Sequence, residues 1–169
     1  MQIVIPAGSL VILCGPAACG KSTFARRHFR RTQIVSSDRC RAMLTDSPAT
    51  QWASSEAFEL FHIIIDKRLA LGRAAVADST ALSKQARRDL RRIARARRKP
   101  VVLIVLNVSK STCLERDAGR RRRVGEEVIG AHIAKLNDAL KDLRNEKYDA
   151  VHILNETEMD RVRIKMRKN

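Results

Sequence analysis

Short apolar segments alternate along the chain with longer segments of helical periodicity. The apolar segments predict strands buried on both faces, as parallel strands sandwiched between helices are. These segments cover residues 10–13, 34–36, 74–77, 101–106 and 151–154, and residues 1–5 add a candidate edge strand. Helical periodicity covers residues 21–31, 39–46, 54–72, 83–98, 110–119 and 126–144. The alternation predicts an α/β fold with a parallel sheet of about five strands and helices on both faces.

The segment 83–98 has the clearest amphipathic pattern. One stripe consists of Ala86, Leu90, Ile93, Ala94 and Arg97. The positions off that stripe are rich in arginine: Arg87, Arg88, Arg91, Arg92, Arg95 and Arg98. We therefore expect a helix with its apolar side on the sheet and a continuous basic ridge on its outer side.

Charge changes this picture of an ordinary globular chain. The chain has 169 residues, 44% of them hydrophobic, which is enough for one substantial core. Its net charge is +16 and 24 residues are arginine. Because guanidinium groups match phosphate oxygens two at a time, a polyphosphate or nucleic-acid partner is favoured over a merely solvated basic surface.

Metal-site and membrane patterns are weak. Cys14, Cys19, Cys40 and Cys113 form no C-x-x-C pair, so we interpret them as reduced apolar residues of a cytoplasmic protein. The histidines are scattered and are interpreted as surface or core residues. Residues 1–20 are uncharged but lack the basic start of a secretory leader, and no segment approaches the roughly 18 apolar residues of a membrane span.

A phosphate-binding loop motif follows the first buried strand. Residues 15–22 read Gly-Pro-Ala-Ala-Cys-Gly-Lys-Ser, a full match to G-x-x-x-x-G-K-[ST] between a strand and a helix. Its glycines let backbone N–H groups converge on phosphate oxygens beside the positive end of the helix. We expect Lys21 to reach the β- and γ-phosphates and Ser22 to ligate Mg²⁺. The candidate phosphate contacts are Gly15, Pro16, Ala17, Ala18, Cys19, Gly20, Lys21, Ser22 and Thr23.

The motif alone does not identify the acceptor of the phosphoryl group, because GTPases, ATP-driven motors and kinases share it. A GTPase would carry D-x-x-G and N-K-x-D after later strands. The corresponding segments read Asp-Ser-Thr-Ala at 78–81 and Asn-Val-Ser-Lys at 107–110. No predicted strand ends in the paired acids of a motor ATPase, so the pattern favours a small kinase.

Two aspartates follow predicted strands, whose carboxyl ends face the ligand crevice in such sheets. Asp38 would orient an acceptor hydroxyl and take its proton, and Arg41, one turn later, would hold a phosphate of the acceptor. The alternative is that Asp38 caps a helix and Arg41 is solvated. Asp78 would hold Mg²⁺ through water or position Ser22. The alternative is that Asp78 caps the helix that follows.

An arginine cluster bracketed by Gly119 and Gly125 follows the fifth helical segment. It consists of Arg116, Arg120, Arg121, Arg122 and Arg123. The glycines predict a mobile helical hairpin that closes arginines over the transferring phosphoryl group. Four consecutive arginines cannot all face one phosphate, so several are solvated or contact nucleic acid. The alternative is a solvated basic turn throughout.

Together, these motifs resemble the N-terminal kinase module of bacterial polynucleotide kinase-phosphatase, an RNA end-healing and sealing enzyme of the P-loop phosphotransferases. The resemblance extends over essentially the whole chain. It rests on the segments GPAACGKST (15–23), SSDRCR (36–41), AFELFHIIIDKRL (57–69), VADST (76–80) and CLERDAGRRRR (113–123). The resemblance implies an ATP-dependent kinase that uses Mg²⁺ or Mn²⁺ to phosphorylate the 5′-hydroxyl end of RNA or DNA beside other modules of a longer enzyme.

The resemblance also implies residue roles. Its catalytic residues would be Lys21, Asp38, Arg41, Arg116 and Arg123. Asp38 would be the general base for the 5′-hydroxyl, and Arg120 would join the lid arginines on the donor phosphates. Gln51 falls in the segment that approaches the acceptor. The match departs from the family at Ala17, Ala18 and Cys19, where Ser and Gly are usual, and at Asp78-Ser79-Thr80, where the family favours Asp-Ala-Thr-Asn.

The sequence thus predicts a polynucleotide kinase domain over residues 1–169, with a lid at about 113–127 and no membrane contact. Aromatic residues make up 4% of the chain, which favours recognition of the sugar-phosphate end over base stacking. A kinase of a small metabolite would need the phosphate loop, base and lid, but not the basic ridge. A noncatalytic RNA-binding module would keep its RNA affinity after Asp38→Asn and would turn over nothing.

Overall fold

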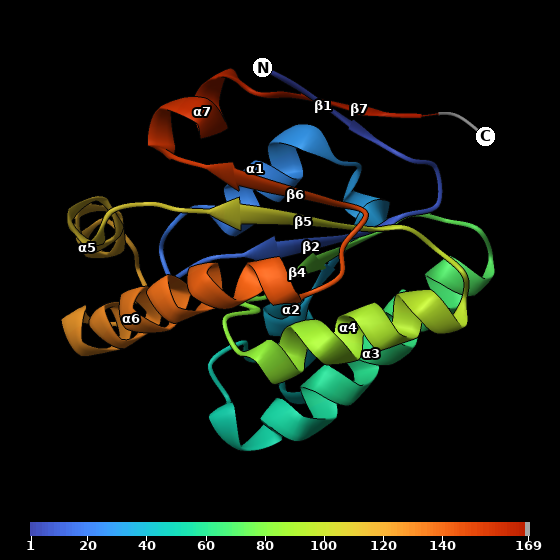
Figure 1. The fold of residues 1–169 in the computed structure, drawn as a ribbon. Helices are drawn as coiled ribbons and strands as arrows, with labels where there is room; N and C mark the ends of the chain where they lie inside the picture. The colour runs from blue at the N-terminus through green and yellow to red at the C-terminus, as the bar shows by residue number, and fades with distance from the viewer. Residues whose placement is uncertain (168–169) are drawn as a thin grey trace.

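A five-stranded parallel sheet forms the centre of the computed structural model, which describes residues 1–167 (Figure 1). The strands, in spatial order, are β3 (Ile34–Ser36), β4 (Ala75–Asp78), β2 (Leu10–Cys14), β5 (Val101–Leu106) and β6 (Ala150–Leu154). Every neighbouring pair is parallel. The predicted α/β fold with a parallel sheet of five strands is confirmed.

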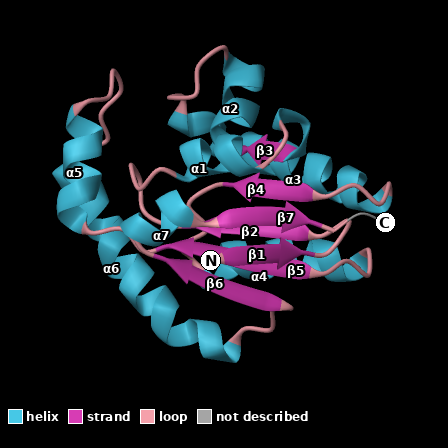
Figure 2. Ribbon diagram, turned by 90° about the horizontal axis from the view of Figure 1, so that it is seen from above, coloured by secondary structure: helices cyan, strands magenta, loops and turns pink. Residues whose placement is uncertain are grey.

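Helices cover both faces of this sheet (Figure 2). The helices are α1 (Lys21–His28), α2 (Ser37–Thr45), α3 (Ser54–Ala70), α4 (Lys84–Ala96), α5 (Lys110–Ala118), α6 (Glu126–Asp142) and α7 (Glu156–Arg161). The short 3-10 helices within residues 1–167 are η1 (Arg31–Gln33), η2 (Gln51–Ala53) and η3 (Leu143–Asn145). α3 and α4 pack side by side on one face, whereas α1 lies on the other.

The central strand β2 is buried along its whole length because its alternate side chains enter two separate cores. Leu10 and Ile12 pack in the core formed with α3 and α4, which includes Phe61. Val11 and Leu13 pack in the core on the α1 side. The strand β6, at one edge of the sheet, differs from the expected burial on both faces, because Val151 and Ile153 are exposed. β3, at the other edge, is also only partly buried.

Residues 1–5 form a strand, but the expectation that it extends the main sheet is wrong. β1 (Gln2–Ile5) pairs in parallel with β7 (Arg163–Met166) in a separate two-stranded sheet. Ile3 and Ile5 anchor β1 in the core on the α1 side. Neither α7 nor β7 was predicted; the four residues of β7 include two charges and carry little strand signal.

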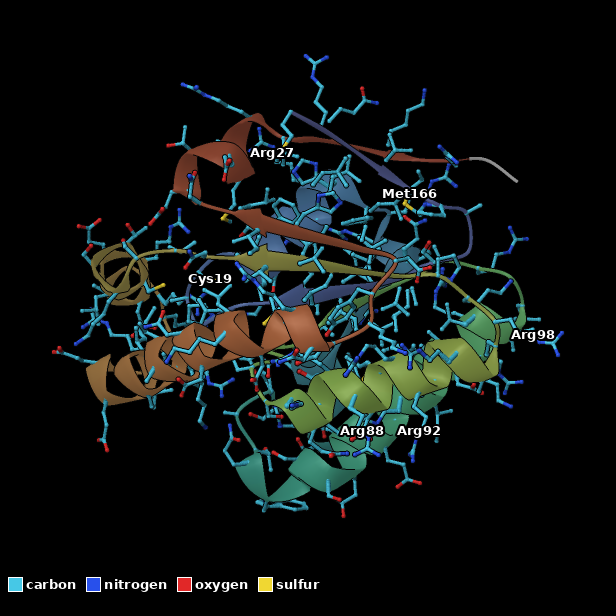
Figure 3. The ribbon with its side chains drawn as sticks, viewed as in Figure 1. Cys19, Arg27, Arg88, Arg92, Arg98 and Met166 are labelled. Carbon is cyan, nitrogen blue, oxygen red and sulfur yellow. The ribbon has the colours of Figure 1, made fainter. Side chains whose placement is uncertain are left out.

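α4 buries one of the arginines expected on its outer ridge and partly buries a second. Arg87 is 1% exposed and its Nη2 atom lies 2.5 Å from Oε1 of Glu146, which is also buried. Arg91 lies 3.4 Å from the same carboxylate and 5.0 Å from the ring centre of Tyr148. A single-sequence pattern cannot reveal this pairing, because Glu146 is far away in the chain. The exposed arginines of α4 are therefore Arg88, Arg92 and Arg95, and Arg98 is exposed just beyond the helix end. Figure 3 labels Arg88, Arg92 and Arg98.

Arg97 does not face the sheet, although the sequence pattern places it on the apolar stripe of the helix. It follows the last residue of α4, where the helical periodicity no longer applies. Its Nε and Nη2 atoms donate to the two carboxylate oxygens of Asp66 at 2.7 Å each. This bidentate pair joins α3 to the end of α4 at the surface.

The cysteines are free and buried, as expected for reduced apolar residues. Burial raises the pKa of the Cys14 and Cys113 thiols to about 11, so both stay protonated near neutral pH. Among residues 1–167, no helix is long and apolar enough to cross a bilayer. The same residues contain no group of three His, Cys, Asp or Glu side chains placed to hold a metal ion.

Candidate active site

The phosphate loop connects β2 to α1 at the carboxyl edge of the sheet (Figure 1). The N–H of Gly15 donates to the carbonyl oxygen of Thr80 at 3.0 Å, which ties the loop to the segment after β4. A Cβ atom at residue 15 would lie 2.9 Å from the Cys19 sulfur, so the position accepts only glycine. Gly20, with φ +101°, opens α1. The motif therefore forms the strand, loop and helix that the sequence predicts.

Lys21 folds back over the centre of the loop. Its Nζ atom donates to the carbonyl oxygens of Gly15 at 2.9 Å and Pro16 at 2.6 Å. The residue is only 9% exposed. A phosphate group that enters the loop would replace these two neutral carbonyls with charged oxygens. The ammonium group of Lys21 forms stronger hydrogen bonds with charged oxygens.

Ser22 and Asp78 meet beside the loop. The Ser22 hydroxyl donates to Oδ2 of Asp78 at 2.8 Å. Burial raises the pKa of Asp78, while the Ser22 hydrogen bond and the charge of Lys21 act in the opposite direction. The alternative in which Asp78 caps a helix is wrong, because Ser83 caps α4. A hydroxyl and a carboxylate oxygen side by side match the oxygen ligands that Mg²⁺ prefers.

Asp38 and Arg41 form a pair at the start of α2. The helix cap is Ser36, so the cap alternative for Asp38 is wrong. Arg41 is 5% exposed rather than solvated, and its Nη1 atom donates to Oδ1 of Asp38 at 2.6 Å and to the Pro48 carbonyl at 3.1 Å. Its Nη2 atom donates to Ser54 at 3.4 Å. A buried guanidinium thus holds a carboxylate that is itself 66% exposed.

The two aspartates face one region. The negative charge of Asp38 contributes to the raised pKa of Asp78, after burial as the main cause. The strand register gives the same placement: Asp78 pairs with Ser36 of β3 on one side and with Leu13 of β2 on the other. Asp38, two residues after Ser36, therefore lies at the same edge of the sheet as the phosphate loop. This agrees with the expectation that residues after parallel strands meet at one edge of the sheet.

Gln51 begins η2, in the connection that Arg41 holds through Pro48 and Ser54. Its side chain is exposed. The next residue, Trp52, is the only tryptophan of the chain and is 83% exposed. Trp52 was not among the predicted site residues, although a tryptophan among small polar residues is a signal of an exposed aromatic.

The predicted lid, at about 113–127, covers most of α5, the connection 119–125 and the first residues of α6. Arg116 reaches the phosphate loop, where its Nη1 atom donates to the Cys19 carbonyl at 2.7 Å. Asp117 is buried and accepts the N–H groups of Val124 and Gly125, each at 3.1 Å. The backbone hydrogen bond from Gly125 is the main cause that lowers the pKa of Asp117. The lid connection is therefore anchored rather than free.

The remaining lid arginines are exposed on this connection. Arg120 lines a cleft of about 330 Å³ together with Arg116, Thr23 and Met159, next to the phosphate loop. Arg123 is near enough to Asp117 for its charge to stabilise the carboxylate. Within residues 1–167, no hydrogen bond or salt bridge joins Arg123 to the phosphate loop.

His132 of α6 touches the phosphate loop, which corrects its interpretation as an ordinary surface or core histidine. Its Nδ1 atom accepts the N–H of Ala17 at 3.1 Å. Burial, followed by the charges of Lys21 and Lys135, lowers the pKa of His132, so the ring is a neutral acceptor near neutral pH. The imidazole therefore occupies a loop N–H that a phosphate oxygen would need.

Solved structures with the same fold include nucleic-acid and metabolite enzymes. A chain of the Pnkp1/Rnl/Hen1 RNA repair complex matches with a TM-score of 0.71 and 19% identity, over 84% of this chain and 47% of that chain. A gluconokinase from Sinorhizobium meliloti 1021 matches with a TM-score of 0.56 and 18% identity, over 89% and 83%. The Mycobacterium tuberculosis APS kinase CysC, solved with AMPPNP and APS, matches with 0.56 and 12%, over 89% and 90%. At these identities, the likeness shows the fold.

The chain spans about half the length of the RNA repair chain that it matches. Among proteins with curated descriptions, none matches the sequence. The family model described as an AAA domain matches residues 10–143, which include the phosphate loop, both aspartates and the lid. With this match and the P-loop kinase fold, the chain belongs to the AAA domain family.

Proposed function

We propose that this domain is an ATP-dependent kinase that phosphorylates the 5′-hydroxyl end of RNA or DNA. The observation that carries the proposal is the exposed carboxylate of Asp38, held by buried Arg41 at the same edge of the sheet as the phosphate loop. The net charge of +16 and the likeness to a chain of an RNA repair complex support a nucleic-acid acceptor. We extend the proposal to the whole chain as one module of a longer cytoplasmic enzyme.

The donor side would hold ATP through the loop N–H groups and Lys21. Ser22 and Asp78 would hold Mg²⁺ or Mn²⁺, with Asp78 acting through water. The cation neutralises phosphate charge when it is bound. Arg116 already touches the loop, and closure of the lid would bring Arg120 and Arg123 toward the donor phosphates. The cleft beside Arg116 and Arg120 has room for the nucleoside.

On the acceptor side, Asp38 would take the proton of the 5′-hydroxyl. The 5′ oxygen forms a bond to the γ-phosphorus, the bond from that phosphorus to the β-phosphate oxygen breaks, and ADP leaves. Arg41 would orient Asp38. We also assign to Arg41 the contact with a phosphate of the acceptor, with Gln51 in the same region. Positioning and charge stabilisation supply the catalysis.

Transfer from γ-labelled ATP to a panel of acceptors tests the proposal. The panel contains a 5′-hydroxyl oligoribonucleotide, the matching oligodeoxyribonucleotide, their 5′-phosphorylated forms and a pool of small alcohols. We expect label on the 5′-hydroxyl strands and none on the 5′-phosphorylated controls. Label confined to a small alcohol would reject the polynucleotide acceptor.

A small-metabolite kinase is a second candidate, and one cavity favours it. A cavity of about 470 Å³ lies between α3, α4 and α6, beside Ser79 and Thr80 at the end of β4. Polar side chains of His62, Gln85 and Lys135 line it, so a small hydroxylated molecule would find hydrogen-bond partners. Glutamine substitution of Arg88 and Arg92, both exposed, would leave such an activity unchanged and would weaken a polynucleotide kinase. Arg87 and Arg91 are unsuitable for this test because they pair with Glu146.

A further inference from the structure

A basic cleft of about 540 Å³ lies at the amino edge of the sheet, away from the phosphate loop. The turns before β2, β3 and β4 and the end of β7 form its walls. Figure 3 shows Met166, which lines the cleft, on the other side of the molecule from Cys19 of the phosphate loop. Four arginines line it: Arg30, Arg68, Arg73 and Arg167.

The positive charge of this cleft is uncompensated. Residues 1–37, 67–77 and 161–169, which supply every lining residue, contain no Asp or Glu. Within residues 1–167, none of the four arginines forms a salt bridge, although arginines elsewhere in the protein do. Burial and then repulsion from Arg73 lower the pKa of Arg68. An anion bound here would relieve this repulsion.

The cleft is also a preformed shape rather than a loose gathering of side chains. The Nε and Nη2 atoms of Arg68 donate to the Ala74 carbonyl at 3.0 and 2.9 Å, which fixes the guanidinium. Gly8 and Gly72 both have positive φ, and a Cβ at Gly8 would lie 3.2 Å from the Gly72 carbonyl oxygen. Two tight turns therefore meet without bulky side chains. The lining contains no aromatic ring, so the cleft suits phosphate oxygens rather than a stacked base.

The position of the cleft connects it with the acceptor side. Gln33, which lines the cleft, directly precedes the edge strand β3, and Asp38 follows that strand. Three residues of strand span roughly 10 Å. Phosphates of a stacked single strand repeat at about 3.4 Å along its axis, so a few nucleotides cover this length. A strand whose 5′ end lies at Asp38 would reach the cleft along the outer edge of the sheet.

We propose that this cleft binds the phosphate backbone of the acceptor strand a few nucleotides from its 5′ end. The inference rests on the proposed function, because that function places the 5′ end at Asp38. The exposed guanidinium groups of Arg73 and Arg167 contact phosphate, and Arg68 fixes the floor of the cleft. Binding is independent of base sequence and sensitive to salt.

Binding of a fluorescein-labelled single strand of about 12 nucleotides, measured by anisotropy over a range of salt concentrations, tests the cleft directly. The test variant is Arg73→Gln with Arg167→Gln. The control is Arg144→Gln with Lys147→Gln, which removes the same charge from exposed residues next to β6, at the far edge of the sheet. We expect the test pair to weaken binding about tenfold and to reduce the salt slope by about 1.4, from two lost phosphate contacts. Equal losses in the two pairs would overturn the proposal.

Acceptor length supplies a second readout. For the test pair, KM should rise about tenfold for the longer strand and stay unchanged for a 5′-hydroxyl dinucleotide, which is too short to reach the cleft. An equal rise for both acceptors would overturn the proposal. If the protein binds the strand through the cleft arginines but transfers no phosphate, the proposed kinase activity is wrong and the proposed binding of nucleic acid by the cleft is retained. If these arginines bind polyglutamate and no nucleic acid, the cleft is a protein-binding surface and the proposal is wrong.

Discussion

Replacing Glu146 by Gln should destabilise the domain strongly, because Arg87 would stay buried without its counter-charge. Both side chains are 1% exposed, and Nε and Nη2 of Arg87 both donate to the Glu146 carboxylate. Tyr148 donates to the same carboxylate at 2.6 Å. Removing one partner of such a buried pair costs about 3–5 kcal/mol of unfolding free energy.

Urea unfolding followed by circular dichroism measures this loss. Arg88→Gln is the matched control: it removes the neighbouring charge from the exposed face of α4 and should change the unfolding free energy by less than about 0.5 kcal/mol. The double variant Arg87→Met with Glu146→Leu should recover much of the loss, because no unpaired charge is then buried. A Glu146→Gln protein as stable as the control variant would refute the argument.

The same pair predicts how stability depends on pH. Burial alone would raise the pKa of Glu146, but hydrogen bonds from Arg87 and Tyr148 and the charge of Arg87 lower it overall. A carboxyl whose pKa is lower in the folded than in the unfolded protein contributes stability above its ordinary pKa. This stability is lost as the pH falls through the lowered value. The stability difference between wild type and Glu146→Gln should therefore be full at neutral pH and shrink in acid.

Three further predictions concern the candidate active site. Lys21→Met should lower phosphoryl transfer by about 10²–10³ without unfolding the domain, as single-turnover rates and a urea titration would show; a small loss would remove Lys21 from the phosphate site. Asp117→Ala should free the connection 119–125 from its anchor. Trypsin should then cut at residues 120–123 severalfold faster than in the Glu115→Ala control, and equal cutting rates would contradict the anchoring role of Asp117. His132→Ala should release the Ala17 N–H and tighten ATP binding by about two- to fivefold in calorimetry, whereas weaker binding would show that His132 contacts the nucleotide instead.

The fold was largely readable from the sequence because its signals are local. Each central strand is a short apolar run, and the phosphate loop is a contiguous motif whose glycines the backbone requires at Gly15 and Gly20. The position of Asp38 and Asp78 at one edge of the sheet followed from a general property of parallel sheets, not from the residues themselves. Their helix-capping alternatives failed because Ser36 and Ser83 occupy those positions.

The features that the sequence did not reveal depend on partners far apart in the chain. Helical periodicity placed Arg87 on the outer side of α4, but Glu146, which pairs with it, lies 59 residues away. The contact between His132 and Ala17 spans 115 residues. The strand β7 exists because β1 offers it a partner, and its own four residues carry little signal. The basic cleft likewise gathers arginines from three separate segments.

The most direct test of the central claim compares wild type with Asp38→Asn in single-turnover transfer from γ-labelled ATP to a 5′-hydroxyl oligonucleotide. ATP affinity is measured on the same samples. The account predicts that the variant binds ATP as wild type does, because Asp38 lies on the acceptor side. Its transfer rate should fall by about 10²–10⁴. Transfer by Asp38→Asn at the wild-type rate, or a wild-type protein that labels no 5′-hydroxyl end, would contradict the account.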